Sequence, residues 1–96
     1  MKMLLVLYTG DNLRFVPDLL SSCEGCSWTE FQGGIGKGSH HRHEGTRTFP
    51  GETMMVLSIL EDARAIEISD LLRSRGAGLP ESDRLHVAVL PVEQFA

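Results

Sequence analysis

A glycine-rich segment from Gly33 to Gly51 divides the sequence into two halves that share one pattern. The segment holds six of the ten glycines and three of the four histidines. Glycine at this density disfavours a helix or a regular strand, because glycine loses more backbone entropy on folding than any other residue. A connection this long in a small domain is uncommon unless it has a function. We therefore expect a functional loop between two structured halves.

The first half predicts a strand, a helix and a second strand. The apolar run Met3–Tyr8 predicts a buried strand, and the alternation over residues 27–32 predicts another. Between them, apolar residues spaced three and four apart predict a helix that starts near Asn12. That start places Pro17 in the second turn, where it removes a hydrogen bond and kinks the helix. Gly25 ends this helix.

The second half repeats the order. Thr53–Leu60 predicts a strand, and a helix capped by Glu61 or Asp62 is expected to end at Gly76. Leu85–Val92 predicts the last strand. The order β-α-β-β-α-β is that of the ferredoxin-like α+β fold, which has four antiparallel strands and two helices on one face.

Length and charge narrow the class of protein. The 96 residues predict a single domain over residues 1–96, with a core thin enough to make self-association reasonable. The net charge of −4 argues against a protein that coats nucleic acid. Within Gly33–Gly51, however, Lys37, Arg42 and Arg47 face Glu44 alone, so this segment carries +2 and the remainder −6. A basic loop on an acidic body favours an anionic ligand.

No targeting segment is recognisable. The apolar run Met3–Tyr8 is shorter than the apolar region of a signal peptide and far shorter than a membrane-spanning helix. We therefore expect a cytoplasmic protein that does not insert into a membrane.

The base of the loop carries a candidate anion site. Gly34, Gly36 and Gly38 alternate with other residues, and Lys37 lies among them. Backbone N–H groups in glycine-rich turns approach anions closely, and a lysine adds positive charge. The run lacks the spacing of a P-loop, and it does not follow a parallel strand as a dinucleotide fingerprint does. Both readings stay open here: a phosphate-binding loop base, and a hairpin tip without a ligand.

The tip of the loop carries a candidate metal site at His40, His41 and His43. On an extended strand, His41 and His43 project to one side and His40 to the other. This spacing suits a divalent transition metal, with Glu44 or a second copy completing the coordination shell. Solvated loop histidines are the more common situation, and Arg42 between the ligands counts against a metal.

Cys23 and Cys26 form a Cys-x-x-Cys pair, a spacing typical of redox-active dithiols. Redox thiols are usually activated at a helix N-terminus, whereas this pair falls at the C-terminus of the predicted helix, where the dipole has the opposite effect. One pair also supplies too few thiolates for a structural zinc site. We expect buried or half-buried small residues, with a dithiol enzyme as the alternative.

The sequence predicts a protein without enzymatic activity. No nucleophile is recognisably aligned with an oriented base, and no paired-carboxylate motif is present. The strands lack the aromatic pattern with which the same element order binds RNA in RRM domains. His86 alternates with the inward residues of its strand and is interpreted as structural.

Two segments resemble the P-II (PII) family of signal-transduction proteins. Residues 25–36 resemble the strand that enters the T-loop of this family: a small residue, a hydrophobic-Thr-Glu-hydrophobic stretch and a glycine-rich run. Residues 85–93 resemble its closing strand, which ends in a hydrophobic-Pro-Val-Glu/Asp run. Both lie at matching places in the β-α-β-β-α-β order, so the resemblance covers nearly the whole chain.

The resemblance implies a homotrimer whose sheets face inward, with adenine nucleotides in clefts between subunits. It implies that residues 33–51 are a T-loop that contacts a partner protein. By position, the residues that approach phosphate are Gly34, Gly36, Lys37 and Gly38.

The sequence also departs from the family. The loop lacks the tyrosine that some PII proteins modify, and residues 75–83 lack the lysine of the second phosphate-contacting stretch. Arg75 or Arg84 would substitute for that lysine. The leading hypothesis is a PII-like regulator that binds a small anionic effector, an adenine nucleotide being one option. The alternative is a divalent-metal-binding or metal-tolerance trimer that uses the loop histidines; the divalent-cation-tolerance family is a related trimeric ferredoxin-like group.

Overall fold

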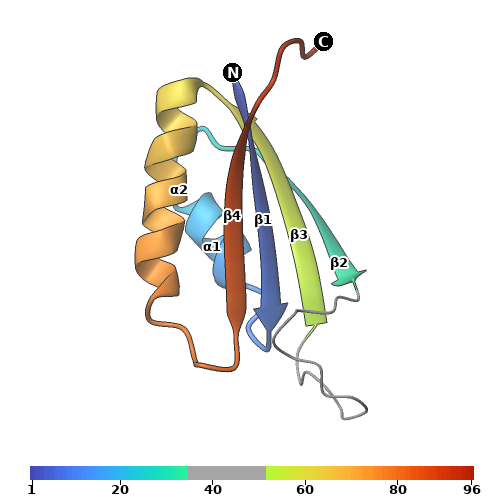
Figure 1. Cartoon of the computed structure of the whole chain (residues 1–96), viewed down its shortest axis with the longest axis vertical. Coiled ribbons are helices and arrows are strands. Elements are labelled where there is room, and N and C mark those ends of the chain that lie inside the picture. The colour runs from blue at the N-terminus through green and yellow to red at the C-terminus, as the bar shows by residue number, and fades with distance from the viewer. Residues whose placement is uncertain (35–51) are drawn as a thin grey trace.

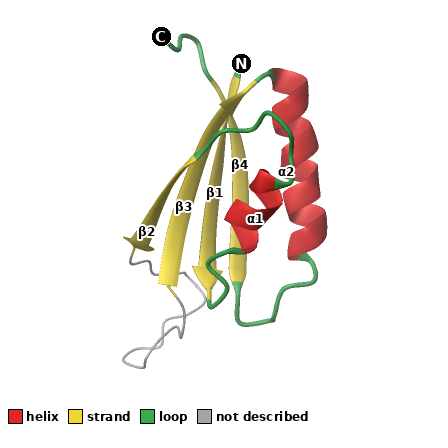
Figure 2. Cartoon of the chain, turned by 180° about the vertical axis from the view of Figure 1, so that it is seen from behind, coloured by secondary structure: helices red, strands yellow, loops and turns green. Residues whose placement is uncertain are grey.

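The computed structural model describes residues 1–34 and 52–96 and confirms the predicted fold. Its elements are β1 (Lys2–Gly10), α1 (Phe15–Ser21), β2 (Thr29–Gly34), β3 (Glu52–Leu60), α2 (Asp62–Gly76) and β4 (Arg84–Pro91). The four strands form one sheet in the order β2-β3-β1-β4, and every neighbouring pair is antiparallel. Both helices lie on the same face of this sheet (Figures 1 and 2).

The core lies between the sheet and the two helices. Successive residues of a strand point to opposite faces, so every second residue of β1 and β3 packs against the helices. Tyr8 is the largest of these side chains and is fully buried. The other buried side chains are Leu4, Val6, Val16, Leu19, Leu20, Met54, Val56, Leu60, Ala65, Ile68 and Leu72.

Helix α2 is the element that the sequence predicted best. It ends at Gly76, as expected, and Glu61 is its N-cap residue, although the Glu61 side chain makes no capping hydrogen bond. The Asp62 carboxylate, in the first turn of the helix, accepts a hydrogen bond from the N-terminal amine at 2.7 Å.

Neither of the two helices in the described part of the chain has the length and apolar character that crossing a membrane requires.

Helix α1 starts three residues later than the sequence predicted. The Asn12 side chain accepts a hydrogen bond from the Arg14 N–H at 3.2 Å, and the Asn12 carbonyl accepts one from the Phe15 N–H at 3.0 Å. This turn delays the helix to Phe15, so Pro17 falls in the first turn. The first backbone N–H groups of a helix have no partner inside it, and the proline therefore removes no helical hydrogen bond. The predicted loss and kink were wrong.

Strand β2 also lies later than predicted, over Thr29–Gly34 instead of residues 27–32. The register of β2 against β3 shifts between Phe31 and Gly34, and Gly33 has a φ of +83° at this irregularity. Such a bulge lets a strand continue through a residue in the left-handed region, where glycine is favoured. The first two residues of the predicted loop therefore belong to the sheet.

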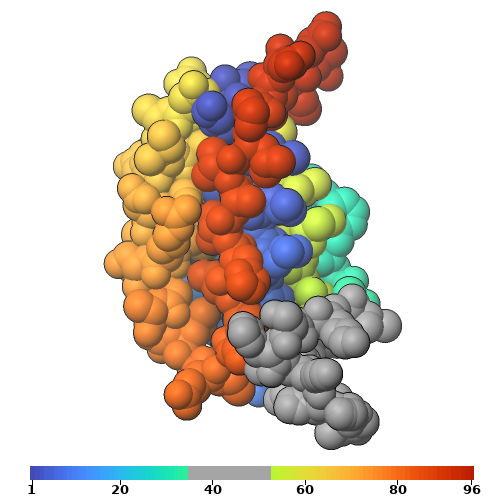
Figure 3. All heavy atoms as spheres, viewed as in Figure 1, coloured from blue at the N-terminus to red at the C-terminus, as the bar shows by residue number. Residues whose placement is uncertain are grey.

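The sheet face opposite the helices carries a continuous group of apolar side chains, which we call the open face. The cross-strand register places these residues on it: Met3, Leu5, Leu7, Phe31, Met55, Leu57, Ile59, Ala88 and Leu90. Leu7 is 39% exposed and Phe31 is 51% exposed. In the space-filling view, side chains of β1 and β3 reach the surface between β4 and β2 with no helix over them (Figure 3).

Candidate functional site

One end of the sheet gathers the segments that the sequence analysis singled out. Strand β2 ends there at Gly34, and β3 begins there at Glu52 (Figure 1). Strand β1 also ends here, at Gly10, and β4 begins here, at Arg84. The loop over residues 77–83, which follows α2, closes the same end.

A polar row crosses all four strands at this end, on the side of the open face. Gly34 is paired with Thr53, Thr53 with Thr9, and Thr9 with Arg84. The Thr9 and Thr53 hydroxyls lie 3.0 Å apart and share a hydrogen bond. The row therefore lines up two hydroxyl groups between a glycine backbone and a guanidinium group.

Arg84 joins the polar row to the loop over residues 77–83. Its Nη1 donates hydrogen bonds to the backbone carbonyls of Glu81, at 2.8 Å, and of Asp83, at 2.9 Å. Both acceptors are main-chain carbonyl oxygens, so these two contacts hold the guanidinium group against the loop. Arg84 thus fixes the end of the loop beside the polar row.

Tyr8 ties the same loop to the end of β1 from the core side. Its hydroxyl donates to the Asp83 Oδ2 at 2.8 Å and accepts from the Asn12 N–H at 3.0 Å. The ring is fully buried beside Phe15, with the ring centroids 6.1 Å apart. Burial raises the pKa of Tyr8, and the hydrogen bond to Asp83 raises it further. The buried hydroxyl therefore fixes both the turn after β1 and the loop before β4.

Ionisation of Tyr8 is expected to destabilise the fold at alkaline pH. The pKa is raised above its ordinary value of 10.0 in the folded chain, so the contribution of Tyr8 to stability is complete below pH 10 and is lost as the pH rises through the folded pKa. Tyr8 is the single tyrosine, so tyrosinate absorbance in a pH titration reports on it alone. Unfolding in urea should show wild type losing its advantage over Tyr8→Phe above pH 10. Titration of the folded chain at the ordinary pKa would contradict the buried network.

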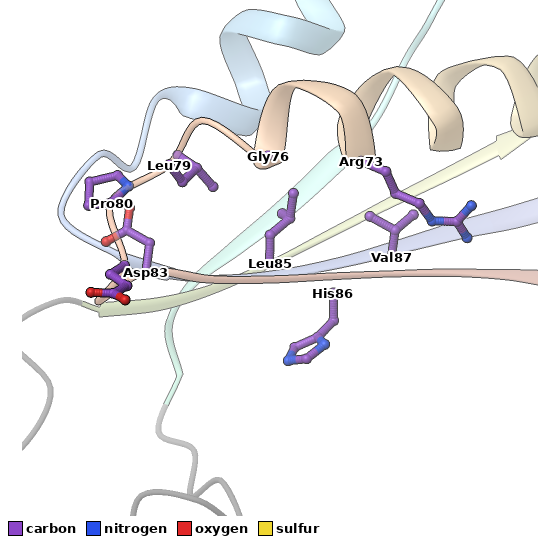
Figure 4. A pocket seen from close by; sticks show the side chains of 9 residues that line it. Arg73, Gly76, Leu79, Pro80, Asp83, Leu85, His86 and Val87 are labelled. Carbon is purple, nitrogen blue, oxygen red and sulfur yellow. The ribbon is translucent and has the colours of Figure 1, made fainter.

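A groove of about 530 Å³ lies on the other side of β4, between this strand and the C-terminal end of α2. Leu85 and Val87 point into it toward the helix, whereas His86 points away to the opposite face (Figure 4). Its rim mixes the basic Arg73 with acidic residues of the loop. Glu81 and Asp83 outnumber the single basic residue Arg73 in its lining, so the polar row suits an anion better than this groove does.

The structure brings together some of the predicted site residues and separates another. Gly34 and Arg84 lie at the two ends of the polar row. Arg75 lies in the last turn of α2, in the helix layer, and is exposed. The remaining predicted residues, Gly36, Lys37, Gly38, His40, His41 and His43, lie outside the described residues. The metal prediction stays a prediction, and within residues 1–34 and 52–96 no group of three potential ligands is placed to hold a metal ion.

Thr9, Thr53, Tyr8 and Asp83 are site residues that the sequence did not single out. Thr9 and Thr53 are 44 positions apart, and Tyr8 and Asp83 are 75 apart. If the register between β1 and β3 had been known, the two threonines would have been recognised as a pair. Residues directly opposite each other in antiparallel strands lie on one face of the sheet. The buried position of Tyr8 in an apolar run was the one available signal, since a buried hydroxyl needs a partner.

No protein-family model and no curated protein sequence matches the chain. Its fold, in contrast, is similar to that of CPII from Thiomonas intermedia, a nitrogen regulatory PII-like protein. CPII bound to ADP and bicarbonate is 20% identical with a TM-score of 0.60, over 93% of this chain and 86% of CPII. CPII bound to ADP, AMP and bicarbonate is 13% identical with a TM-score of 0.57, over 100% of this chain and 98% of CPII. The chain therefore has the fold of PII-like proteins.

Proposed function

We propose that this chain is a divergent PII-like regulatory protein. It assembles as a homotrimer, binds a small anionic effector at the clefts between subunits and presents residues 33–51 to a partner protein. The observation that carries this proposal is the open face, an uncovered apolar sheet surface that ends at the polar row. The chain acts by binding and not by catalysis.

The open face is the surface that the trimer buries. Monomeric proteins seldom leave a contiguous apolar patch of this kind in water. Leu5 lies at its centre, paired with Leu57 on β3 and with Ala88 on β4. Three copies whose open faces point to one axis would cover all of these side chains at once. The polar row, at the edge of that face, would then lie beside a neighbouring subunit.

The polar row favours an elongated anion. Backbone N–H groups, hydroxyl groups and a guanidinium group are the donors that phosphate takes in proteins. The row spans three strand spacings, about 14 Å. One phosphate or bicarbonate ion is too short to reach both ends, whereas an adenine nucleotide is longer. That CPII is bound to ADP supports the same class of effector for this chain.

Titration calorimetry with ATP, ADP, AMP and bicarbonate tests the effector. We expect Arg84→Ala to weaken nucleotide binding by roughly 10- to 100-fold, because a hydrogen bond to a charged group contributes about 1.5–3 kcal/mol. Lys2→Ala is the matched control: it removes one positive charge at the opposite end of β1 and should leave the affinity unchanged. An equal loss in both variants, or no binding of any of these compounds to wild type, would contradict the proposed site. Circular dichroism confirms that each variant is folded.

A further inference from the structure

Cys23 and Cys26 lie in a tight turn between α1 and β2, well away from the polar row. The Cys26 N–H donates to the Cys23 carbonyl at 3.4 Å, and Gly25 between them has a φ of +79°. A hydrogen bond from the fourth residue to the first closes a β-turn, and a left-handed third residue is the conformation that glycine adopts in a type II turn. Such a turn keeps its first and fourth Cα atoms within about 7 Å, close to the range that a disulfide requires.

Both thiols are half-buried against the edge of the core. The Cys23 Sγ donates to the Leu19 carbonyl at 3.5 Å. Burial raises the pKa of the Cys26 thiol, the neighbouring Cys23 raises it further, and the Arg64 guanidinium acts in the opposite direction. A raised pKa counts against an activated nucleophile, and hence against the dithiol enzyme considered above. A disulfide that forms once per chain, without catalytic turnover, requires only that the two cysteines lie close together, and the turn provides this.

Arg64 holds the turn in this conformation. Its Nη2 donates to the Glu24 carbonyl at 2.6 Å and lies 4.0 Å from the Cys26 Sγ. Its Nη1 is paired with Glu67 at 3.0 Å, so the guanidinium is fixed from both sides. Arg64 belongs to the first turn of α2, and the 12 residues to Gly76 correspond to about 18 Å of helix. The turn is therefore separate from the effector end.

We propose that Cys23 and Cys26 form a reversible disulfide and make this turn a thiol-redox site. The co-reactant is a low-molecular-weight disulfide of the glutathione class. One thiolate attacks this disulfide, which forms a mixed disulfide and releases one thiolate of the reagent. The second cysteine thiolate then displaces the other half of the reagent. The two cysteines lose two protons and two electrons, and the reagent gains the electrons as two thiols.

The full chain is equilibrated in glutathione buffers of increasing oxidised fraction, quenched with acid, alkylated with N-ethylmaleimide and weighed intact. We expect wild type to lose two hydrogens and to take up neither maleimide nor glutathione. Dithiothreitol should restore two alkylated thiols. Because the second step is intramolecular, the wild-type disulfide should form at oxidised-glutathione concentrations roughly 10-fold below those that modify a single cysteine.

The variants Cys23→Ser and Cys26→Ser are the matched controls, since each keeps one thiol and cannot complete the second step. Each should stop at a single glutathione adduct. Wild type that accumulates the same adduct, or that keeps two alkylatable thiols at every buffer ratio, would overturn the proposal. The measurement involves neither the effector nor the trimer, so it is independent of the function proposed above.

Discussion

Replacing Leu5 with aspartate is expected to convert the proposed trimer into monomers. Leu5 lies at the centre of the open face, between Leu57 and Ala88. In the trimer, three carboxylates would be buried near one axis without partners, and each buried unpaired charge costs several kcal/mol. In the isolated chain the same side chain points to water, so the fold is retained. Light scattering coupled to size exclusion should show the mass fall by a factor of three.

Ile66→Asp provides the matched control for this experiment. Ile66 is an apolar residue on α2 that is 52% exposed, in the helix layer and away from the open face. The same change of charge there should leave the trimer intact. A wild-type chain that is already monomeric, or an Ile66→Asp variant that dissociates as Leu5→Asp does, would show that the open face is not the subunit interface.

Gly10→Ala is expected to destabilise the fold by about 2–5 kcal/mol, the sum of overpacking and of a broken buried hydrogen bond. A Cβ atom at Gly10 would lie 2.5 Å from the Asp83 Cγ and 2.6 Å from its Oδ1, and it would also meet the Tyr8 hydroxyl. Tyr8 is buried and has no room to withdraw, so the end of β1 has to shift together with the loop over residues 77–83. Urea unfolding at a fixed protein concentration measures the loss.

Two comparisons separate this clash from a general effect of removing glycine. Gly25 has a φ of +79°, and nothing lies within 4 Å of a Cβ atom added there. The loss of stability in Gly25→Ala should therefore stay near the roughly 1–2 kcal/mol that a left-handed backbone costs an alanine. In an Asp83→Ala background, Gly10→Ala should lose less stability than in wild type, because the clash with the Asp83 carboxylate is removed and only that with the Tyr8 hydroxyl remains. Equal losses in the two backgrounds would contradict the described packing.

The fold was predictable because its central elements carry strong periodic signals. Strands β1 and β3 are buried on the helix side and apolar on the open face, and α2 has a clear stripe and a glycine end. The boundaries that the sequence misplaced have local causes. The hydrogen-bonded turn at Asn12 delays α1, and the bulge at Gly33 extends β2. Strand β2 is exposed along its whole length, so its side-chain pattern is weakly constrained by burial.

The candidate site was only partly predictable because it depends on register. Gly34 and Arg84 were chosen for their chemistry and for the resemblance to PII proteins, and they lie in one row across the sheet. Thr9 and Thr53 complete that row only once β1 and β3 are paired. The Tyr8–Asp83 contact likewise joins residues from opposite ends of the chain. No local pattern contains either contact.

Native mass spectrometry of the full chain with ADP tests the central claim most directly, because one spectrum reports both the assembly and its ligand. The proposed PII-like function predicts a trimer that binds up to one nucleotide per subunit, with occupancy that falls in the Arg84→Ala trimer. A chain that stays monomeric at micromolar concentration, or a trimer that binds ADP no better than the Arg84→Ala variant does, would contradict the account.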